Sequence, residues 1–214
     1  MLVKASTSGA MRDMLALSPV IPVVTLKDAA DAVPLARALL AGGLKVVEVT
    51  LRTSAGMEGI RRIAAEVPEL VVGSGTVLTA ADLDGSAEAG ARFAVSPGLT
   101  PILLAEAATR DLPYLPGAAT ASEVMMALEH GFDCLKVFPA SSVGTAAIKS
   151  LAGPFPQVTF CATGGITPEN AGDYLRLPNI AAVGASWVVP DDALAAKDWE
   201  EIENRARQAA ALSG

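Results

Sequence analysis

A lysine stands inside a segment that otherwise has the composition of a buried strand. The segment CLKVFPA spans residues 134–140, and Lys136 lies between Leu135 and Val137. An ammonium group in an apolar interior is costly unless it is paired or gives up its proton, because burial disfavours the charged form. The neutral amine is a nucleophile that can form a Schiff base with a carbonyl substrate, and the protonated imine then weakens a neighbouring bond. Lys136 is therefore a candidate for covalent catalysis.

The segment KVVEVTL at residues 45–51 leads into the other groups that such chemistry requires. Glu48, Thr50 and Arg52 follow one another at a spacing of two, so on a strand they share one face. The Glu48 carboxylate could move protons, and Arg52 could bind a substrate carboxylate through two parallel hydrogen bonds. The alternative is that Glu48 and Lys136 form an interior ion pair without a catalytic role. If the predicted strands close into a parallel α/β barrel, both residues would lie near its mouth. Charged residues there are usually functional, which favours a catalytic role over a purely structural one.

A second group of residues is suited to binding an anion. In CATGGITPEN (161–170), Gly164 and Gly165 follow a predicted strand and precede a helix that we expect to begin at Thr167-Pro168. Glycines let backbone N–H groups approach an anion, and a helix N-terminus adds a positive dipole. The segment VGAS at 183–186 ends the next strand. In parallel α/β barrels, the loops after the last two strands often bind phosphate. An ordinary glycine turn remains the alternative.

These residues must be positioned by short β-rich segments that recur along the chain. The predicted strands are residues 20–26, 45–51, 71–77, 93–97, 114–118, 134–140, 158–164 and 180–186. Several are continuous apolar runs, which is typical of parallel strands covered on both faces. Their later halves also present Ser74, Thr76 and Ser96 as polar candidates.

Segments of helical composition separate the strands. Thr100 with Pro101, and Thr120 with Glu123, have the pattern of helix N-caps, and Gly42-Gly43, Gly90 and Gly131 stand where helices should end. Strands that alternate with helices form parallel βαβ units, and eight such units without a G-x-G-x-x-G motif favour a (β/α)₈ TIM barrel. SGAMRDMLAL predicts an additional N-terminal helix. No linker or break in composition divides the chain, so we predict one domain over residues 1–214.

The composition limits the classes of partner and the cell compartment that this protein could have. The net charge is −7, from 16 basic and 23 acidic residues, which argues against nucleic acid or an anionic membrane as a partner but leaves a small anionic substrate open. The N-terminus lacks the pattern of a signal peptide, and no apolar run approaches the ~18 residues of a membrane span. Two cysteines fit a reducing compartment. We therefore expect a cytoplasmic protein.

Other candidate residues are better explained by structure than by chemistry. The only histidine, His130, precedes Gly131 and is expected to cap a helix, and a single histidine makes a metal site improbable. Cys134 is expected to fill space in the core, and Trp187 and Trp199 are expected to pack.

Seven segments in order resemble the 2-keto-3-deoxy-6-phosphogluconate (KDPG) aldolases. They are EVTLR (48–52), GSGTVL (73–78), SPGLT (96–100), PGAATASE (116–123), KVFPA (136–140), TGGI (163–166) and GASW (184–187). The resemblance spans residues 20–190 and implies a trimeric (β/α)₈ barrel that cleaves KDPG to pyruvate and glyceraldehyde 3-phosphate in the Entner–Doudoroff pathway. It implies a class I mechanism without metal or cofactor.

The resemblance also implies a role for individual residues. Lys136 would form the Schiff base, and Glu48 would be the general acid and base. Arg52 and Thr76 would bind the pyruvate-derived carboxylate end. The remaining substrate-binding residues would be Pro97, Phe138 and Thr163 around the pyruvate unit, with Gly164, Gly165 and Ser186 at the phosphate.

The chain departs from the common family pattern at three places, and several alternatives remain open. One departure is the segment SSVGTAAIK (141–149), which differs from the commoner acidic or Gly-rich version and could shift the sugar-acid preference. Family members often have proline where this chain has Ala162, and a second glycine where it has Ala185, which could alter phosphate affinity. The substrate could instead be 2-keto-3-deoxy-6-phosphogalactonate or 4-hydroxy-2-oxoglutarate. A metal-dependent phosphosugar epimerase would need more histidines. A non-catalytic barrel that binds pyridoxal phosphate through Lys136 would leave Arg52 and Glu48 without a task.

Overall fold

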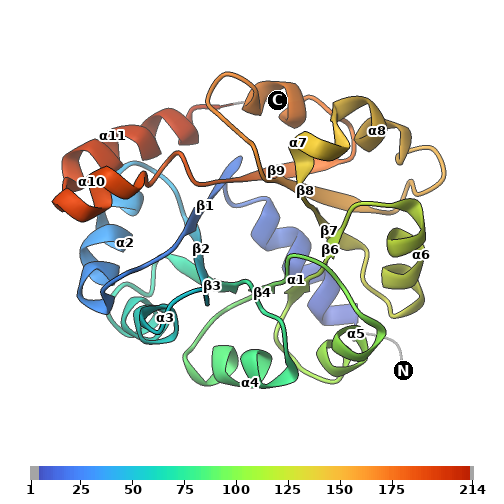
Figure 1. Ribbon diagram of the computed structural model, residues 1–214, viewed down its shortest axis with the longest axis horizontal. Helices are drawn as coiled ribbons and strands as arrows, with labels where there is room; N and C mark the ends of the chain where they lie inside the picture. Colours follow the sequence, from blue (N-terminus) through green and yellow to red (C-terminus); the bar gives the residue numbers. More distant parts are fainter. Residues whose placement is uncertain (1–4, 213–214) are drawn as a thin grey trace.

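A computed structural model describes residues 5–212, and its centre is a ring of short parallel strands (Figure 1). The strands are β1 (Val20–Val24), β2 (Val46–Thr50), β3 (Val71–Gly75), β4 (Ala94–Val95), β5 (Tyr114–Leu115), β6 (Gly117–Ala118), β7 (Cys134–Val137), β8 (Thr159–Thr163) and β9 (Ile180–Ala185). Their order in the sheet is β5-β4-β3-β2-β1-β9-β8-β7-β6. All eight predicted strand segments are present.

The ring closes through a single strand that is interrupted in its middle. β5 pairs with β4 and β6 pairs with β7, while only Pro116 separates β5 from β6. Proline has no N–H to donate, so it interrupts a ladder, but its carbonyl still accepts a hydrogen bond from the Lys136 N–H at 2.9 Å. Counting β5 and β6 as one strand gives eight, and the predicted parallel α/β barrel is confirmed.

Helices cover the outside of the ring in Figure 1. They are α2 (Ala32–Ala41), α3 (Ala55–Glu66), α4 (Ala80–Glu88), α5 (Pro101–Ala108), α6 (Ala121–Glu129), α7 (Ala140–Val143), α8 (Thr145–Ser150), α9 (Ala171–Leu175), α10 (Asp191–Ala196) and α11 (Trp199–Ala210), with a 3₁₀ turn at Ala29–Asp31. The Thr100 and Thr120 hydroxyls accept hydrogen bonds from the N–H groups of Leu103 and Glu123, as predicted for caps. None of the described helices is both long and apolar enough to cross a membrane.

One predicted helix start is wrong. Helix α9 begins at Ala171, and its N-cap is Asn170 rather than Thr167. The Asn170 side chain accepts a hydrogen bond from the Thr167 N–H at 2.8 Å and donates one to the Gly165 carbonyl at 2.9 Å. These bonds hold residues 165–170 as a turn, so the positive end of a helix does not directly follow the two glycines.

The barrel interior has its own apolar core, closed at one end by α1 (Ala5–Leu15). The predicted N-terminal helix is present, although its bounds differ from the expected residues 8–17. Met11 and Leu15 are buried against Phe93 in this inner core, and Figure 1 shows α1 behind the ring of strands. The Arg12 guanidinium donates to the Asp133 carboxylate at 2.8 Å, which ties α1 to the start of β7. The amino ends of the strands are therefore plugged, and the opposite end is the open mouth.

Candidate active site

Lys136 and Glu48 meet inside the barrel. Lys136 comes from β7 and Glu48 from β2, and three strands (β8, β9 and β1) lie between them in the sheet, so the pair spans the interior. The Lys136 Nζ lies 3.3 Å from Glu48 Oε1, and the two side chains are 6% and 5% exposed. Each buried charge therefore has a partner of opposite sign, which lowers the cost of burying it. Both side chains therefore point into the barrel.

A glycine on the neighbouring strand makes room for the Glu48 carboxylate. A Cβ atom at Gly75 would lie 2.2 Å from Glu48 Oε1, far inside van der Waals contact. Gly75 is opposite Thr50 in the β2–β3 ladder, so a side chain there would point into the same space. Sequence reasoning missed this residue, because its role depends on a neighbour 27 positions earlier in the chain.

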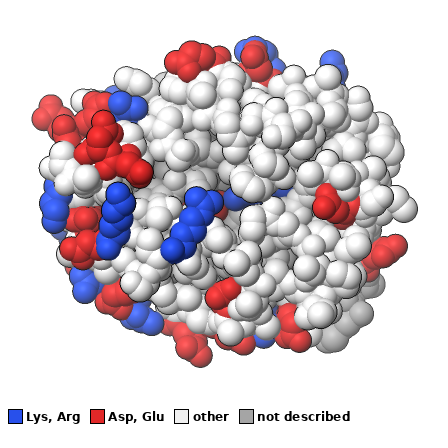
Figure 2. Space-filling view, viewed as in Figure 1, with Lys and Arg blue, Asp and Glu red and all other residues white. Residues whose placement is uncertain are grey.

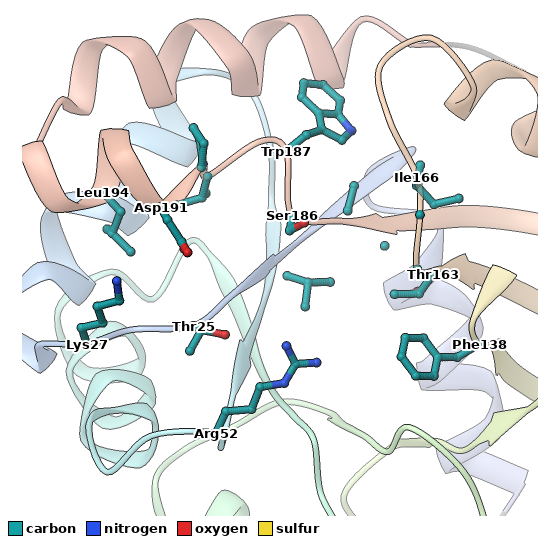
Figure 3. A pocket seen from close by; sticks show the side chains of 17 residues that line it. Thr25, Lys27, Arg52, Phe138, Thr163, Ile166, Ser186, Trp187, Asp191 and Leu194 are labelled. Atoms are coloured by element: carbon teal, nitrogen blue, oxygen red, sulfur yellow. The ribbon is translucent and has the colours of Figure 1, made fainter. Parts of the chain in front are cut away.

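Arg52 and Thr76 lie together at the mouth. The Arg52 Nε donates a hydrogen bond to Thr76 Oγ1 at 3.2 Å. Thr76 has a φ of 61°, a left-handed conformation that is uncommon for a residue other than glycine. Such conformations persist where the surrounding structure requires them and are frequent at functional sites. Arg52 itself is exposed, with its guanidinium over the opening (Figure 3).

A cavity of about 720 Å³ opens above the pair at the carboxyl ends of the strands. In Figure 2, basic atoms occupy the hollow at the centre of this face, while most acidic atoms lie nearer its edge. Of the predicted site residues, the cavity lining contains Arg52, Phe138, Thr163, Gly164, Gly165 and Ser186. Lys136 and Glu48 lie outside this lining, one layer deeper, with the Lys136 Nζ 5.3 Å from the centre of the Phe138 ring. Phe138 therefore borders both the cavity and the lysine.

Pro97 belongs to the other side of the mouth and does not line this cavity. A Cβ atom at Gly117 would lie 2.4 Å from the Pro97 carbonyl carbon, so glycine is needed for the two segments to approach. Gly117 is paired with Lys136 in the β6–β7 ladder, which places Pro97 near the lysine.

Thr163 extends from the end of β8 toward the cavity. A Cβ atom at Gly184 would lie 2.3 Å from Thr163 Oγ1, so Gly184 leaves room for this hydroxyl. Beneath it, the Cys161 Sγ is 3.8 Å from the same hydroxyl, and burial raises the pKa of the Cys161 thiol to about 12. Cys161 is thus a neutral, space-filling residue in the barrel.

The turn after β8 requires both of its glycines. Gly164 and Gly165 have φ values of 96° and 73°, in the left-handed region that favours glycine. A Cβ atom at Gly165 would lie 2.4 Å from Ser141 Oγ, and the Ser141 N–H donates to the Gly164 carbonyl at 3.0 Å. Ser186 is exposed in the turn after β9 and faces the same cavity (Figure 3).

Three polar residues of the lining were missed by sequence reasoning. Thr25 and Lys27 follow β1, and Asp191 begins α10. The Thr25 hydroxyl lies 2.8 Å from that of Thr50, which joins the ends of β1 and β2. Thr25 and Lys27 could have been found, because polar residues after the first strand of a barrel belong to its mouth.

Two polar candidates from the strands turn out to face the helices. Neighbours of Ser74 and Ser96 on the same strand faces, Val72 and Ala94, belong to the outer core. The Ser96 Oγ lies 2.5 Å from the Tyr114 hydroxyl and donates a hydrogen bond to the Gly98 carbonyl at 2.6 Å. The period of two assigns them to the outer face, because Gly75 and Val95 point inward.

The residues assigned structural roles behave as expected. His130 caps α6, and its Nδ1 donates to the Met126 carbonyl at 2.9 Å. Cys134 is buried in the inner core, and Trp187 and Trp199 pack against the outer one. Within residues 5–212, no group of three or more His, Cys, Asp or Glu side chains is placed to hold a metal ion.

Comparison with known proteins agrees with this geometry. The aldolase family model described as KDPG and KHG aldolase matches residues 11–205. The chain belongs to this aldolase family. The KHG/KDPG aldolase of Escherichia coli (strain K12) is 49% identical over 197 residues, covering 92% of each chain. The 2-dehydro-3-deoxy-phosphogluconate aldolase of Zymomonas mobilis is 53% identical over 184 residues, covering 84% of this chain and 88% of its own.

Solved structures of the aldolase family have the same fold. The KDPG aldolase of Legionella pneumophila, with pyruvate captured as a covalent carbinolamine intermediate, superposes with a TM-score of 0.92 at 42% identity, covering 94% of this chain and 98% of its own. The Zymomonas mobilis enzyme with 3-phosphoglycerate gives a TM-score of 0.89 at 49% identity, covering 94% and 95%.

Proposed function

We propose that this protein is a class I aldolase that reversibly cleaves 2-keto-3-deoxy-6-phosphogluconate to pyruvate and D-glyceraldehyde 3-phosphate. The observation that carries the proposal is the buried contact of 3.3 Å between Lys136 and Glu48 beneath the open mouth of the barrel. The family relationship supports it, because the Legionella relative was captured with pyruvate as a covalent carbinolamine. The whole chain would act as one catalytic domain.

The reaction begins when Glu48 takes a proton from the Lys136 ammonium. The neutral Nζ attacks the C2 ketone to form a carbinolamine, and Glu48 returns the proton to the C2 oxygen, which leaves as water. The resulting iminium accepts an electron pair when the C4 hydroxyl loses its proton to Glu48 and the C3–C4 bond breaks. Glyceraldehyde 3-phosphate leaves, and C3 of the enamine takes up the proton that Glu48 received, which restores the Glu48 carboxylate. Water then hydrolyses the imine, releasing pyruvate and restoring Lys136.

The other predicted residues would bind the two ends of the substrate. Arg52, supported by Thr76, would pair with the carboxylate, and Pro97, Phe138 and Thr163 would enclose the pyruvate unit. Gly164, Gly165 and Ser186 would hold the phosphate by backbone and hydroxyl donors. The structure of the Zymomonas relative with 3-phosphoglycerate supports a site for a phosphorylated three-carbon acid in this family.

A second substrate is 4-hydroxy-2-oxoglutarate, which the same groups would cleave to pyruvate and glyoxylate. The Escherichia coli relative carries the name KHG/KDPG aldolase, which supports this dual specificity. The galactonate epimer of KDPG differs only in one hydroxyl configuration and uses the same chemistry. A barrel that merely binds pyridoxal phosphate leaves Glu48 and Arg52 unexplained.

We also propose a cytoplasmic homotrimer. Among the described residues, Leu78, Ile102 and Met125 are 61%, 78% and 55% exposed. Leu78 precedes α4, Ile102 lies in the first turn of α5, and Met125 lies in α6. Large apolar side chains on neighbouring elements are typical of a surface that another subunit covers. Sedimentation equilibrium would test this assembly.

Borohydride reduction in the presence of pyruvate tests the mechanism. Reduction converts the imine into a stable secondary amine, so mass spectrometry should find one pyruvyl adduct per chain on Lys136. A sample without pyruvate, and the Lys136→Met variant, should give no adduct at that position. An unmodified Lys136 in the wild-type protein would overturn the mechanism. Steady-state cleavage of KDPG, its galactonate epimer and 4-hydroxy-2-oxoglutarate would then rank the substrates.

A further inference from the structure

The groups assigned to the phosphate carry no formal charge, although a phosphate ester is close to dianionic at neutral pH. Gly164, Gly165 and Ser186 offer hydrogen bonds alone. Among the described residues that line the cavity, the charged ones are Lys27, Arg52 and Asp191. Because Arg52 is bound to Thr76 and is assigned to the carboxylate end, Lys27 is the cation left for the phosphate end.

Lys27 is placed to reach that end. It follows β1 and faces the cavity from the side opposite Phe138 and Thr163, with Ser186 between them (Figure 3). A phosphate held at Ser186 would therefore be approached by the Lys27 ammonium from across the cavity. Lys27 is exposed, so its flexible side chain can move toward a ligand.

The acidic residues nearest to Lys27 in the chain are occupied elsewhere. Asp28 accepts a hydrogen bond from the Ala30 N–H at 2.9 Å, and Asp31 pairs with Lys197 at 3.0 Å. Asp191 lines the same side of the cavity, but no ion pair joins it to Lys27 within the described part of the chain. The Lys27 ammonium is therefore available to a bound anion.

We propose that Lys27 is a specificity-determining residue that selects acceptor aldehydes with an anionic distal group, the phosphate in the first place. This inference rests on the proposed aldolase function. In a chain with a net charge of −7, a local cation at the mouth also offsets the general repulsion of an anionic substrate. Asp191 opposes this effect, so the two residues together set the charge at this end of the cavity.

The test is aldol condensation of pyruvate with glyceraldehyde 3-phosphate or with uncharged glyceraldehyde. In Lys27→Gln, the KM for glyceraldehyde 3-phosphate should rise about fivefold, the effect of one partly exposed charge pair. The KM values for glyceraldehyde and for pyruvate should stay unchanged, and Lys27→Arg should retain the wild-type preference. Asp191→Asn should lower the KM for the phosphorylated aldehyde alone. Lys45→Gln is the matched control, because Lys45 is an exposed lysine at the closed end of the barrel.

Two results would overturn the inference: an unchanged KM for glyceraldehyde 3-phosphate in Lys27→Gln, or an equal rise for both aldehydes. A wild-type protein that forms no pyruvate adduct and condenses neither aldehyde would instead contradict the proposed function. In that case calorimetric binding of glyceraldehyde 3-phosphate still decides the role of Lys27. Weaker binding to Lys27→Gln than to Lys45→Gln supports it, and equal binding contradicts it.

Discussion

The Lys136 Nζ and the Glu48 Oε1 lie 3.3 Å apart in the interior of the barrel, although 88 positions separate the two residues in the chain. Each group alone would be an unpaired charge in a buried site, and each supplies the proton partner of the other. The interior ion pair and the proposed catalytic role are therefore compatible. The same contact lowers the cost of burying the lysine and, in the proposed mechanism, would provide the acceptor for its proton.

Glu48→Gln should lower kcat by about 100-fold or more, because the amide cannot take up the proton that Lys136 releases. Its oxygen can still accept a hydrogen bond from Nζ. The free energy of unfolding should therefore fall by much less than the activation free energy of the reaction rises. Steady-state cleavage and calorimetry of the same samples check both. Glu69→Gln, an exposed substitution at the closed end, is the control. An unchanged kcat would remove Glu48 from the mechanism.

Gly75→Ala should impair catalysis although it leaves Lys136 and Glu48 in the sequence unchanged. The added Cβ would lie 2.2 Å from Glu48 Oε1, so the carboxylate must shift away from Lys136. Misplacement of a catalytic group by about 1 Å can cost on the order of 100-fold in rate. Gly153→Ala is the matched control, since its Cβ would meet no atom closer than 3.7 Å. Equal rates for the two variants would show that the Glu48 position is not critical.

Arg52→Lys should raise the KM for pyruvate in the condensation reaction by about tenfold, because a lysine keeps the charge but loses the two-pronged geometry that matches a carboxylate. Initial rates at varied pyruvate measure this directly. The KM for the aldehyde should change little. A rise in the aldehyde KM alone would assign Arg52 to the other end of the substrate.

The two cysteines should be unreactive in the folded protein at neutral pH. Burial raises the pKa of the Cys134 and Cys161 thiols to about 12, so the reactive thiolate is scarce. A chromogenic thiol reagent should label them only after unfolding. The unfolded thiols ionise near pH 8.5, so their contribution to stability is complete below about that pH and is lost as the pH rises toward the folded value. The urea midpoint should therefore fall between neutral and alkaline pH, and less steeply in a variant with both cysteines replaced by alanine.

Leu15→Ala should destabilise the fold by about 2–5 kcal/mol, the usual cost of emptying a fully buried leucine site. Leu15 is 0% exposed, whereas Leu17 is 39% exposed and Leu17→Ala should have little effect. Urea denaturation compares them. A small loss for Leu15→Ala would mean that α1 is not an integral part of the core.

Much of this architecture was predictable, because a parallel barrel gives strong local signals. The apolar segments carrying Lys136 and Glu48 are typical of central strands, and the period of two placed both side chains on the inner face. Threonine followed by proline or glutamate also located the starts of α5 and α6. These features depend only on neighbours within a few residues.

The features that were missed depend on distant neighbours. Nothing near Gly75 in the chain indicates that Glu48 needs its space, and nothing near Gly184 indicates the same for Thr163. The turn around Asn170 was mistaken for a helix start, because Thr-Pro is a common opening and the side-chain bonds of Asn170 are tertiary detail.

The helix α1 has a consequence for the order of events in catalysis. Because α1 closes one end of the barrel, substrates and products must enter and leave through the open mouth at the other end. Pyruvate bound covalently to Lys136 would lie deepest in the barrel, and the aldehyde would occupy the cavity between it and the mouth. We therefore expect ordered binding and release. In cleavage the aldehyde should leave before pyruvate, and in condensation pyruvate should bind before the aldehyde.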